Sequence, residues 1–373
     1  MTRKSTGKII FADSLTNPDI LYASGFMSHD AFLYFEVNRK KYIVLSSLEL
    51  ERASCEANKE INIINREDFL SETNDKSVNS LFREIILQYK QDKWIVPYNF
   101  PVLYSKIFKN SLSICKEEFF PKRNYKNKKE IKEISKALAV AEKAMSRAET
   151  ILAYSSVNNK LELVYDKKPL TSEFLKNEIN LEIVRNGAHT HGTIASSGLQ
   201  CAIPHNTGSG IIKANLPIII DIFPRLESTG YWGDITRTFV KGKVQKHLKQ
   251  AYDAIKLARD NAISKIKPGA IPSVLHSEAT EDLVKKGFKT GRDSHGKYFG
   301  FFHGLGHGVG LEIHENPRVN ALATIPLETG NVITIEPGIY YPEWGGVRLE
   351  DLIVVTKNGA ENLTKYPNIL EID

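Results

Sequence analysis

The segment HGLGHGVGLEIHE, residues 303–315, decides how the rest of the chain is interpreted. It places His303, His307 and His314 within twelve residues, with four glycines between the first and the last. His303 and His307 have the spacing of a helical zinc motif, but the interspersed glycines disfavour a helix. The segment therefore predicts an extended strand or loop, in which glycine lets other backbone and a substrate approach closely. A lone histidine is usually structural, whereas three in such a segment favour a functional site.

Four carboxylates occur beside apolar, strand-like runs that are bounded by glycine or proline. Asp221 closes LPIIID, Asp234 begins DITRTFV, Glu336 follows VITI and Glu350 follows GGVRL. Each alone could be a turn or surface residue, but burying all four is unfavourable unless a cation compensates. Together with His307 they form an oxygen-rich set, which suits a pair of first-row divalent ions better than a cysteine-based zinc site.

Asp221 and Asp234 are thirteen residues apart, with Glu227–Gly230 as the turn between two expected strands. A hairpin of this length brings the two carboxylates side by side. Two adjacent like charges raise each other's pKa unless a cation lies between them. The pair therefore favours metal binding, and two metal ions about 3.5 Å apart are an arrangement that activates water for hydrolysis.

The length and the element pattern predict two domains. A chain of 373 residues, 42% hydrophobic and 25% charged, is ordinary for a globular protein but long for a single core. Alternating patterns in residues 1–120 predict a small α/β domain without ligand motifs. Its expected elements are strands at 32–37, 41–46 and 92–99 and helices at 47–57 and 100–110.

The remainder is expected to be an α+β core that begins near residue 124. Glycine-punctuated strands are combined there with four periodic helical segments. These expected helices are at 128–153, 172–186, 245–266 and 272–286, with Thr171 as the N-cap of the second. All candidate ligands fall on the strands.

Charge and cysteine usage bear on partners and location. The lysine-rich stretch 121–136 contributes to a net charge of +6 but lacks a nucleic-acid recognition context, so a linker and helix start is favoured. Cys55, Cys115 and Cys201 show no paired spacing, which favours a reducing compartment. Residues 1–14 lack the apolar run of a signal peptide, and no run could span a bilayer. We expect a cytoplasmic protein that binds neither nucleic acid nor membrane.

The motifs HGxGHGxGLxxHE, EPGxY and GGVRxED, with the two aspartates, resemble the pita-bread (M24-type) metallopeptidases. This group includes methionine aminopeptidase, aminopeptidase P, prolidase and creatinase, and the likeness is closest to the Xaa-Pro peptidases. The segments 22–35 and 47–53 resemble the creatinase-type N-terminal domain. The resemblance implies an α+β fold with a creatinase-like α/β domain at 1–124 and a pita-bread catalytic domain at 125–373.

The resemblance implies a role for each of the five candidate ligands. Asp221 would bind one metal ion, and Asp234 and Glu350 would bridge both. His307 and Glu336 would complete the set, and Glu336 would also accept the proton of the attacking water. The implied cofactor is two divalent metal ions, in the first place manganese (Mn²⁺), with Co²⁺, Fe²⁺ or Zn²⁺ as alternatives.

Four further residues match family positions around the metal ions. His205, in AIPHNTGSG, would shield and orient the substrate, and His303 and His314 would lie near the scissile bond and the developing oxyanion. Arg348 would support the metal-site acids and help to bind a substrate carboxylate. The implied partner is a proline-containing peptide, and likeness to prolidases implies a homodimer.

The implied activity is metal-dependent hydrolysis of the Xaa-Pro bond, either at the N-terminus of peptides or in dipeptides. Because proline forms an amide without an N–H group, recognition would depend on ring shape and the free N-terminus. Two alternatives are a metal-free creatinase-like C–N hydrolase and a non-catalytic pita-bread peptide-binding protein. Relatives of both kinds lack ligands that this chain retains.

One departure from the family pattern concerns the aspartate hairpin. The family usually reads Asp-x-Gly with a shorter spacing to the second aspartate, whereas this chain reads Asp221-Ile222-Phe223. The extra residues predict a longer hairpin turn that leaves both aspartates in place. Arg225, near the expected mouth of the pocket, could change the preferred substrate length.

Overall fold

The computed structural model describes residues 5–373 and divides into two compact units, Met1–Arg123 and Asn124–Asp373. Residues 1–4, which belong to the stretch considered for a signal peptide, lie outside the described part. Each unit has its own sheet system and its own hydrophobic core. Among residues 5–373, no helix is both long and apolar enough to cross a membrane.

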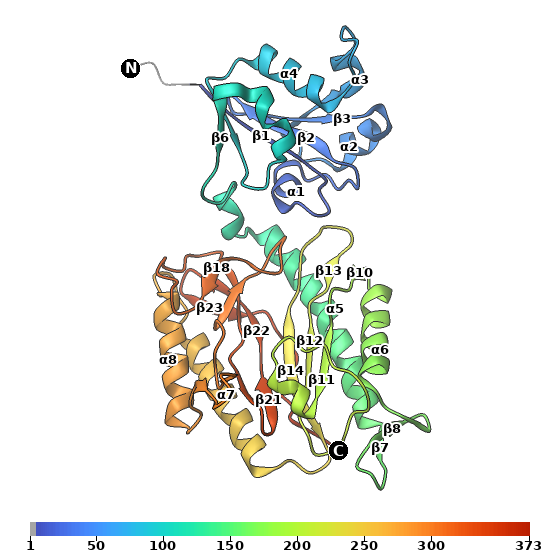
Figure 1. Ribbon diagram of the computed structural model, residues 1–373, viewed down its shortest axis with the longest axis vertical. Helices are drawn as coiled ribbons and strands as arrows, with labels where there is room; N and C mark the ends of the chain where they lie inside the picture. Colours follow the sequence, from blue (N-terminus) through green and yellow to red (C-terminus); the bar gives the residue numbers. More distant parts are fainter. Residues whose placement is uncertain (1–4) are drawn as a thin grey trace. The chain divides into compact units, whose positions relative to one another are not determined.

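The first unit is built on one mixed six-stranded sheet with the order β4-β3-β2-β1-β5-β6 (Figure 1). The strands are β1 (Thr6–Ala12), β2 (Phe32–Val37), β3 (Lys40–Leu45), β4 (Ile61–Asn65), β5 (Lys93–Val96) and β6 (Leu112–Ile114). Residues on one face, including Leu33 and Phe35, pack with α4 (Val78–Tyr89). Those on the other face, including Tyr34, pack with α1 (Pro18–Ser24) and α2 (Leu50–Glu56). The alternation of successive side chains along each strand produces these two apolar layers.

Local sequence explains the hairpin between β2 and β3. Asn38 and Arg39 both have positive φ, 50° and 66°, as a two-residue turn of the type that suits the twist of a β-hairpin requires. Asparagine tolerates this conformation better than most residues. The strands therefore follow the segments predicted for them to within one residue.

The expected helix at 100–110 is wrong in type. The segment forms a 3₁₀ helix, η2 (Val102–Ser111), which Lys109 interrupts with φ 49° and ψ −120°. Ser105 Oγ donates to Val102 O at 2.7 Å and Ser111 Oγ donates to Phe108 O at 2.6 Å. Such local side-chain bonds to the backbone compete with regular helical hydrogen bonding. The helix expected at 47–57 likewise begins as a single 3₁₀ turn, η1 (Ser47–Glu49).

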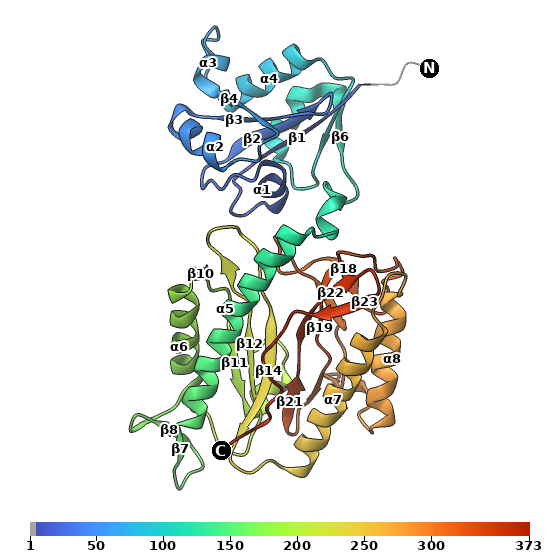
Figure 2. The ribbon, with the colours of Figure 1, turned by 180° about the vertical axis from the view of Figure 1, so that it is seen from behind.

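The second unit combines two larger sheets with two pairs of helices (Figures 1 and 2). The first sheet contains β11 (Ile194–Ser197), β12 (Ile218–Ile222), β14 (Ile235–Lys241) and β24 (Glu371–Ile372). The second contains β17 (Gly306–Gly308), β18 (Glu315–Val319), β19 (Val332–Ile335), β22 (Asp351–Thr356) and β23 (Gly359–Asn362). Helices α5 (Lys128–Ala153) and α6 (Ser172–Arg185) pack on the first sheet, and α7 (Lys246–Lys265) and α8 (Pro272–Lys285) on the second.

Shorter elements complete the two units. They are α3 (Arg66–Phe69), η3 (Pro121–Asn124), η4 (Gly198–Ala202), the β7–β8–β9 sheet (Ser156–Val157, Leu163–Tyr165, Lys168–Pro169) and the pairs β10–β13 (Ala188–His189, Arg225–Leu226), β15–β16 (Gly291–Arg292, Tyr298–Phe299) and β20–β21 (Gly338–Tyr341, Gly345–Arg348).

The four long helices follow their predicted ranges closely because their ends carry clear signals. Asn127 and Glu130 form a capping box at the start of α5, with Glu130 N donating to Asn127 Oδ1 at 3.1 Å. Thr171 caps α6, as expected, by accepting a hydrogen bond from Phe174 N at 3.2 Å. Gly187 and Gly287, both with positive φ, follow the ends of α6 and α8.

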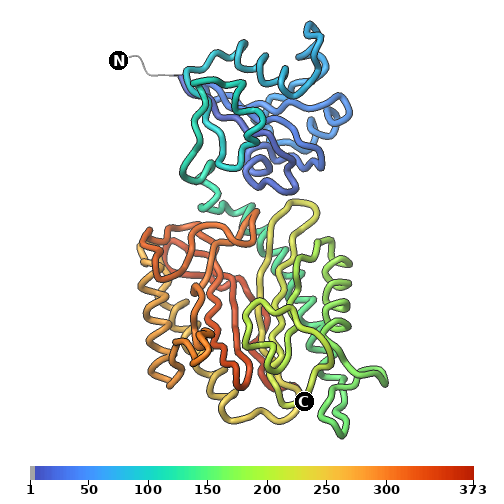
Figure 3. Tube along the Cα trace, viewed as in Figure 1, coloured from blue at the N-terminus to red at the C-terminus, as the bar shows by residue number. Residues whose placement is uncertain are grey.

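The β19–β22 pair is buried on both faces. Val332, Leu352 and Val354 belong to the core that contains α5 and α6, whereas Ile333 and Ile353 belong to the core that contains α7 and α8. A strand buried on both faces has no polar alternation, which explains the continuous apolar runs VITI and LIVV. In Figure 3, the strands coloured green to yellow and those coloured orange to red lie side by side within this unit.

A buried ion pair ties the start of the second unit to the histidine segment. Lys126 Nζ contacts Glu315 Oε1, and these side chains are 1% and 5% exposed. Lys126→Met would remove the Lys126 ammonium from the buried Glu315 carboxylate. We expect a loss of about 3–5 kcal/mol in the free energy of unfolding, measured by urea denaturation followed by tryptophan fluorescence.

The matched control is Lys128→Met, since Lys128 is exposed at the start of α5. It should change the free energy of unfolding by less than about 0.5 kcal/mol. Adding Glu315→Gln to Lys126→Met should recover part of the loss, because the buried charge is removed. Equal losses for the two lysine variants would show that the ion pair does not stabilise this unit.

Candidate metal centre

The two aspartates lie on one face of the β12–β14 hairpin. Asp221 is directly opposite Thr236 in the antiparallel register. Asp234 comes two residues before Thr236, so its side chain is on the same face, diagonal to Asp221. The extra residues of the hairpin are accommodated beyond this point: Gly233 N donates to Pro224 O at 3.0 Å and Arg225 Nε donates to Gly230 O at 3.1 Å. The longer turn therefore leaves the aspartate register intact.

The other three candidate ligands come from the second sheet and its borders. His307 is in β17, Glu336 follows β19, and Glu350 lies between β21 and β22. His307 Nε2 is 3.3 Å from Glu336 Oε1 and 3.7 Å from Asp234 Oδ2. Single ligand atoms of Asp234, His307 and Glu350 all lie within 4.8 Å of one another. Segments distant in sequence thus meet at one cluster.

Burial makes the charged forms of these acids unfavourable. Burial, followed by the nearby Glu350 and Asp221, raises the pKa of Asp234 well above its usual range. Burial, followed by Glu336 and Asp221, does the same to the pKa of Glu350. Burial also raises the pKa of Glu336 to about 7. These shifts are those of carboxyls crowded into a site that needs a cation.

His307 presents a lone pair to this cluster. Burial, with a smaller effect of His314, lowers its pKa to about 3, so the imidazole is neutral near pH 7. Its Nδ1 is 3.2 Å from Gly308 O, and because a carbonyl only accepts, Nδ1 carries the hydrogen. Nε2, which faces Glu336 and Asp234, is then unprotonated. A lone pair aimed at carboxylates is repulsive without a cation and is a good ligand with one.

The positive charge of Arg348 partly compensates the negative charge of the acids. Its Nη2 donates to Asp221 Oδ2 at 2.7 Å, while Asp221 Oδ1 is buried without a hydrogen-bond partner among the described residues. Four carboxylates, one of them with an unpartnered oxygen, and a bare imidazole nitrogen form a donor set that fits divalent cations. The residues that would hold them are Asp221, Asp234, His307, Glu336 and Glu350.

All the polar atoms of Arg348 have protein partners. Its Nη1 donates to Tyr340 Oη at 2.9 Å and Pro204 O at 3.2 Å, and its Nε donates to Thr236 Oγ1 at 3.2 Å. Thr236 Oγ1 in turn donates to Glu350 Oε2 at 2.8 Å. Arg348 is 3% exposed and is thus placed to support the acids.

Tyr340 and Thr236 were not expected from the sequence as site residues. Tyr340 is the last residue of EPGIY, so the motif itself contained the signal. Thr236 follows Asp234 at the two-residue spacing that keeps a side chain on the same face of a strand. That two-residue periodicity could have identified Thr236 as a site residue from the sequence.

The three outer histidines are placed differently from one another. His303 is bonded at both ring nitrogens, with Nδ1 2.8 Å from Gly304 O and Nε2 3.0 Å from Tyr340 Oη. Burial, with a smaller effect of Arg348, lowers its pKa to about 3. His205 and His314 are exposed, and the His314 ring packs edge-on against His307 with centroids 4.4 Å apart. Only the latter two are accessible to a ligand without rearrangement.

A profile of metallopeptidase family M24 matches residues 132–357, which is more than half of the chain. The chain belongs to this family. The family expected from the motifs is therefore confirmed, and so is a larger M24 pita-bread domain preceded by a smaller N-terminal one.

The relatives found by sequence include Xaa-Pro dipeptidases of two archaea. The Pyrococcus horikoshii protein is 38% identical over 247 residues, which cover 65% of this chain and 63% of that protein. The Pyrococcus furiosus protein is 37% identical over the same length, covering 65% and 64%. The alignments thus span less than two thirds of these curated relatives.

Solved structures match nearly the whole chain. The prolidase from Pyrococcus horikoshii superposes with a TM-score of 0.79 at 28% identity, covering 98% of this chain and 95% of that one. The X-Pro aminopeptidase from Thermotoga maritima gives a TM-score of 0.82 at 23% identity, covering 99% and 98%. The second likeness concerns the fold alone.

The raised carboxyl pKa values predict that cation binding releases protons. Glu336 has a folded pKa of about 7 against an ordinary value of 4.5, so between these values the folded protein holds more protons than the unfolded chain. The contribution of Glu336 to the stability of the metal-free protein should therefore fall as pH rises through this window, whereas His303 and His307, with lowered pKa values, contribute in the opposite sense below about pH 6.5. The apparent affinity for Mn²⁺ should rise over the same window.

Titration calorimetry with Mn²⁺ in buffers of different ionisation enthalpy measures the proton release directly. Urea denaturation of the chelator-treated protein across the same pH range measures the stability. An affinity independent of pH, without proton release, would show that the acids are already ionised before a cation binds.

Proposed function

We propose that this protein is a dinuclear-metal-dependent peptidase that hydrolyses the bond before proline in Xaa-Pro dipeptides or at the N-terminus of Xaa-Pro peptides. The supporting observation is the buried convergence of Asp221, Asp234, His307, Glu336 and Glu350, whose charges and lone pairs need a cation. The names of similar sequences and structures, an Xaa-Pro dipeptidase and a prolidase, supply the substrate class.

The bound cations would supply Lewis acidity and lower the pKa of a water molecule. Glu336 would take the proton of that water at a carboxylate oxygen. His314, whose pKa is lowered by the partial burial of its ring and by Arg318, would be neutral and donate an N–H to the developing oxyanion. The exposed His205 would orient the substrate at the entrance.

His303 receives a different proposed role from its two neighbours. Since Tyr340 Oη accepts from Arg348, its own hydrogen is free to bond to His303 Nε2. His303 would thus fix the position of Tyr340. Tyr340 in turn would hold the Arg348 side chain that contacts Asp221. The proposed ligand set is unaffected by this reassignment.

Several finer assignments belong to the same proposal. The unit Met1–Arg123 would be the creatinase-like N-terminal domain and Asn124–Asp373 the catalytic domain. Manganese as the native metal and a homodimeric state rest on resemblance. A cytoplasmic location rests on cysteine usage. A role for Arg225 in substrate length remains a prediction, although its Nε is bonded within its own turn.

The central test is reconstitution of chelator-treated protein with Mn²⁺, followed by assays on Xaa-Pro dipeptides and Xaa-Pro-Xaa peptides. We expect hydrolysis of at least one class only after metal is restored. Preference for dipeptides would assign a prolidase, and preference for longer peptides an aminopeptidase P. Full activity on a C–N substrate after complete metal removal would instead support the creatinase-like alternative.

Glu336→Gln separates proton transfer from metal binding. The amide retains an oxygen ligand but cannot accept a proton, so kcat should fall by about 10²–10⁴-fold. Calorimetry should show that the protein still binds Mn²⁺. An unchanged kcat with bound metal would remove Glu336 from the proposed proton transfer.

Asp234→Ala tests the non-catalytic alternative. The variant loses a carboxylate that faces His307, so we expect weaker Mn²⁺ binding and loss of peptidase activity. Peptide binding measured by calorimetry supplies the second readout. If peptide binding is unchanged in the variant and neither protein hydrolyses the peptide, the fold serves here as a binding scaffold.

A further inference from the structure

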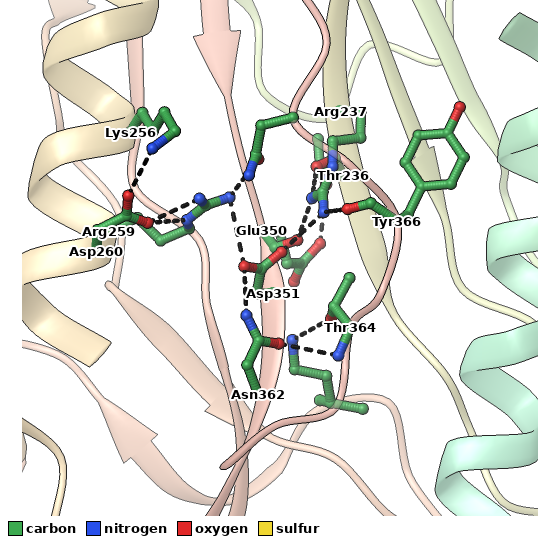
Figure 4. A network of polar contacts seen from close by, with 12 residues as sticks. Thr236, Arg237, Lys256, Arg259, Asp260, Glu350, Asp351, Asn362, Thr364 and Tyr366 are labelled. Carbon is green, nitrogen blue, oxygen red and sulfur yellow. Dashed lines mark hydrogen bonds and ion pairs between the residues drawn. The ribbon is translucent and has the colours of Figure 1, made fainter. Parts of the chain in front are cut away.

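We propose that Arg237 is a positioning residue that fixes the separation of Asp234 and Glu350, the two acids assigned to bridge the metal ions. This inference rests on the proposed metal centre. Arg237 is on β14, three residues after Asp234, and is 1% exposed. Its guanidinium reaches the backbone that carries Glu350 (Figure 4).

Every direction of the Arg237 guanidinium has an acceptor. Nη1 donates to Glu350 O at 2.7 Å and to Thr236 O at 2.9 Å. Nη2 donates to Asp351 Oδ1 at 2.9 Å and to Tyr366 O at 2.8 Å, and Nε donates to Pro367 O at 3.1 Å. Arginine has five N–H hydrogens, and five acceptors surround it. A buried cation so fully satisfied holds its partners in one arrangement.

Two of these acceptors belong to the segments that carry the proposed bridging acids, directly before β14 and β22. The Glu350 carbonyl is on the ligand residue itself, and the Thr236 carbonyl is two residues from Asp234. Glu350 N also donates to Thr236 O at 3.1 Å, so this carbonyl is shared between the two strands. The planar guanidinium of Arg237 therefore sets the distance between β14 and the start of β22. The side chains of Asp234 and Glu350 meet at this point.

Asp351 holds the guanidinium in place from the far side. Its Oδ2 accepts from Asn362 Nδ2 at 2.8 Å and is 3.4 Å from Arg259 Nη1. Arg259 Nη2 donates to Asp260 Oδ1 at 2.8 Å (Figure 4). Its Nη1 also donates to Asn368 Oδ1 at 2.7 Å. Arg259 thus contacts the same Asp351 carboxylate as Arg237, but within residues 5–373 it makes no hydrogen bond to the Glu350 backbone.

The two arginines provide a matched pair of variants. Both are buried and both contact Asp351, so lysine at either position should lower the thermal midpoint of unfolding. Lysine carries a point charge with three donors and cannot reproduce the planar fork that links the Glu350 and Thr236 carbonyls. Only Arg237→Lys should therefore disturb the bridging carboxylates.

The experiment compares Arg237→Lys, Arg259→Lys and the unaltered full chain, each freed of metal and titrated with Mn²⁺ alone. Outer groups that orient metal ligands typically contribute about 10–100-fold in affinity, and this loss is expected for Arg237→Lys. Arg259→Lys should stay within about 3-fold of the unaltered chain. Electron paramagnetic resonance of the manganese-loaded proteins should show altered coupling between the ions only in Arg237→Lys.

Equal affinities and identical spectra for the two variants, with equal loss of thermal stability, would overturn the inference and leave the metal centre intact. Failure of the unaltered chain to bind Mn²⁺ would overturn the proposed function as well. If Arg237→Lys does not fold, Asp351→Asn replaces it. Asp351→Asn retains an oxygen acceptor for Arg237 but removes the negative charge. It should lower the Mn²⁺ affinity by a smaller factor than Arg237→Lys. An unchanged Mn²⁺ affinity would also overturn the inference.

Discussion

The second unit is organised around the mutual repulsion of four acids beside an unprotonated imidazole nitrogen. Asp234 and Glu350 are nearly inaccessible to solvent, and Arg348 is the cation that the described structure places in direct contact with Asp221. Repulsion of this kind is tolerated only if the surrounding scaffold is rigid. The sheets that are buried on both faces, and the helices on either side, supply that rigidity.

Support for the acids comes from two arginines that act in different ways. Arg348 neutralises Asp221 directly and orders Tyr340 and Thr236 around the site. In the part of the chain that the structure describes, Arg237 donates no hydrogen bond to a carboxylate of the five ligands and instead donates to the backbone carbonyl of Glu350. One contribution is electrostatic and the other geometric. The pair illustrates why the residues behind a metal ligand matter as much as the ligand itself.

The sequence predicted those features that depend on local chemistry. Helices α5 and α6 were predicted because their caps and their apolar periodicity lie within one continuous stretch of sequence. The motif residues indicated one site because the negative charge of acids beside apolar strands needs a compensating cation. The engagement of His303 was not predictable, since its partner Tyr340 is 37 positions away. The Arg237 bonds join residues 113 or more positions apart, except for that to Thr236, and depend on strand pairing. The interruption of η2 at Lys109 likewise reflects serine bonds that compete with periodicity.

The distribution of ligands along the chain has a consequence for metal choice. Asp221 and Asp234 are made well before His307, Glu336 and Glu350, and the second sheet must pair before the set is complete. Of the proposed ligand set, the nascent chain thus first carries only the two aspartates. Two carboxylates bind copper or zinc ions weakly compared with sites that include imidazole or thiolate. We therefore expect the cation to be selected by the completed site and not by a nascent segment. On this expectation, the order of the ligands in the chain makes metal binding follow the formation of the site geometry that discriminates among metals.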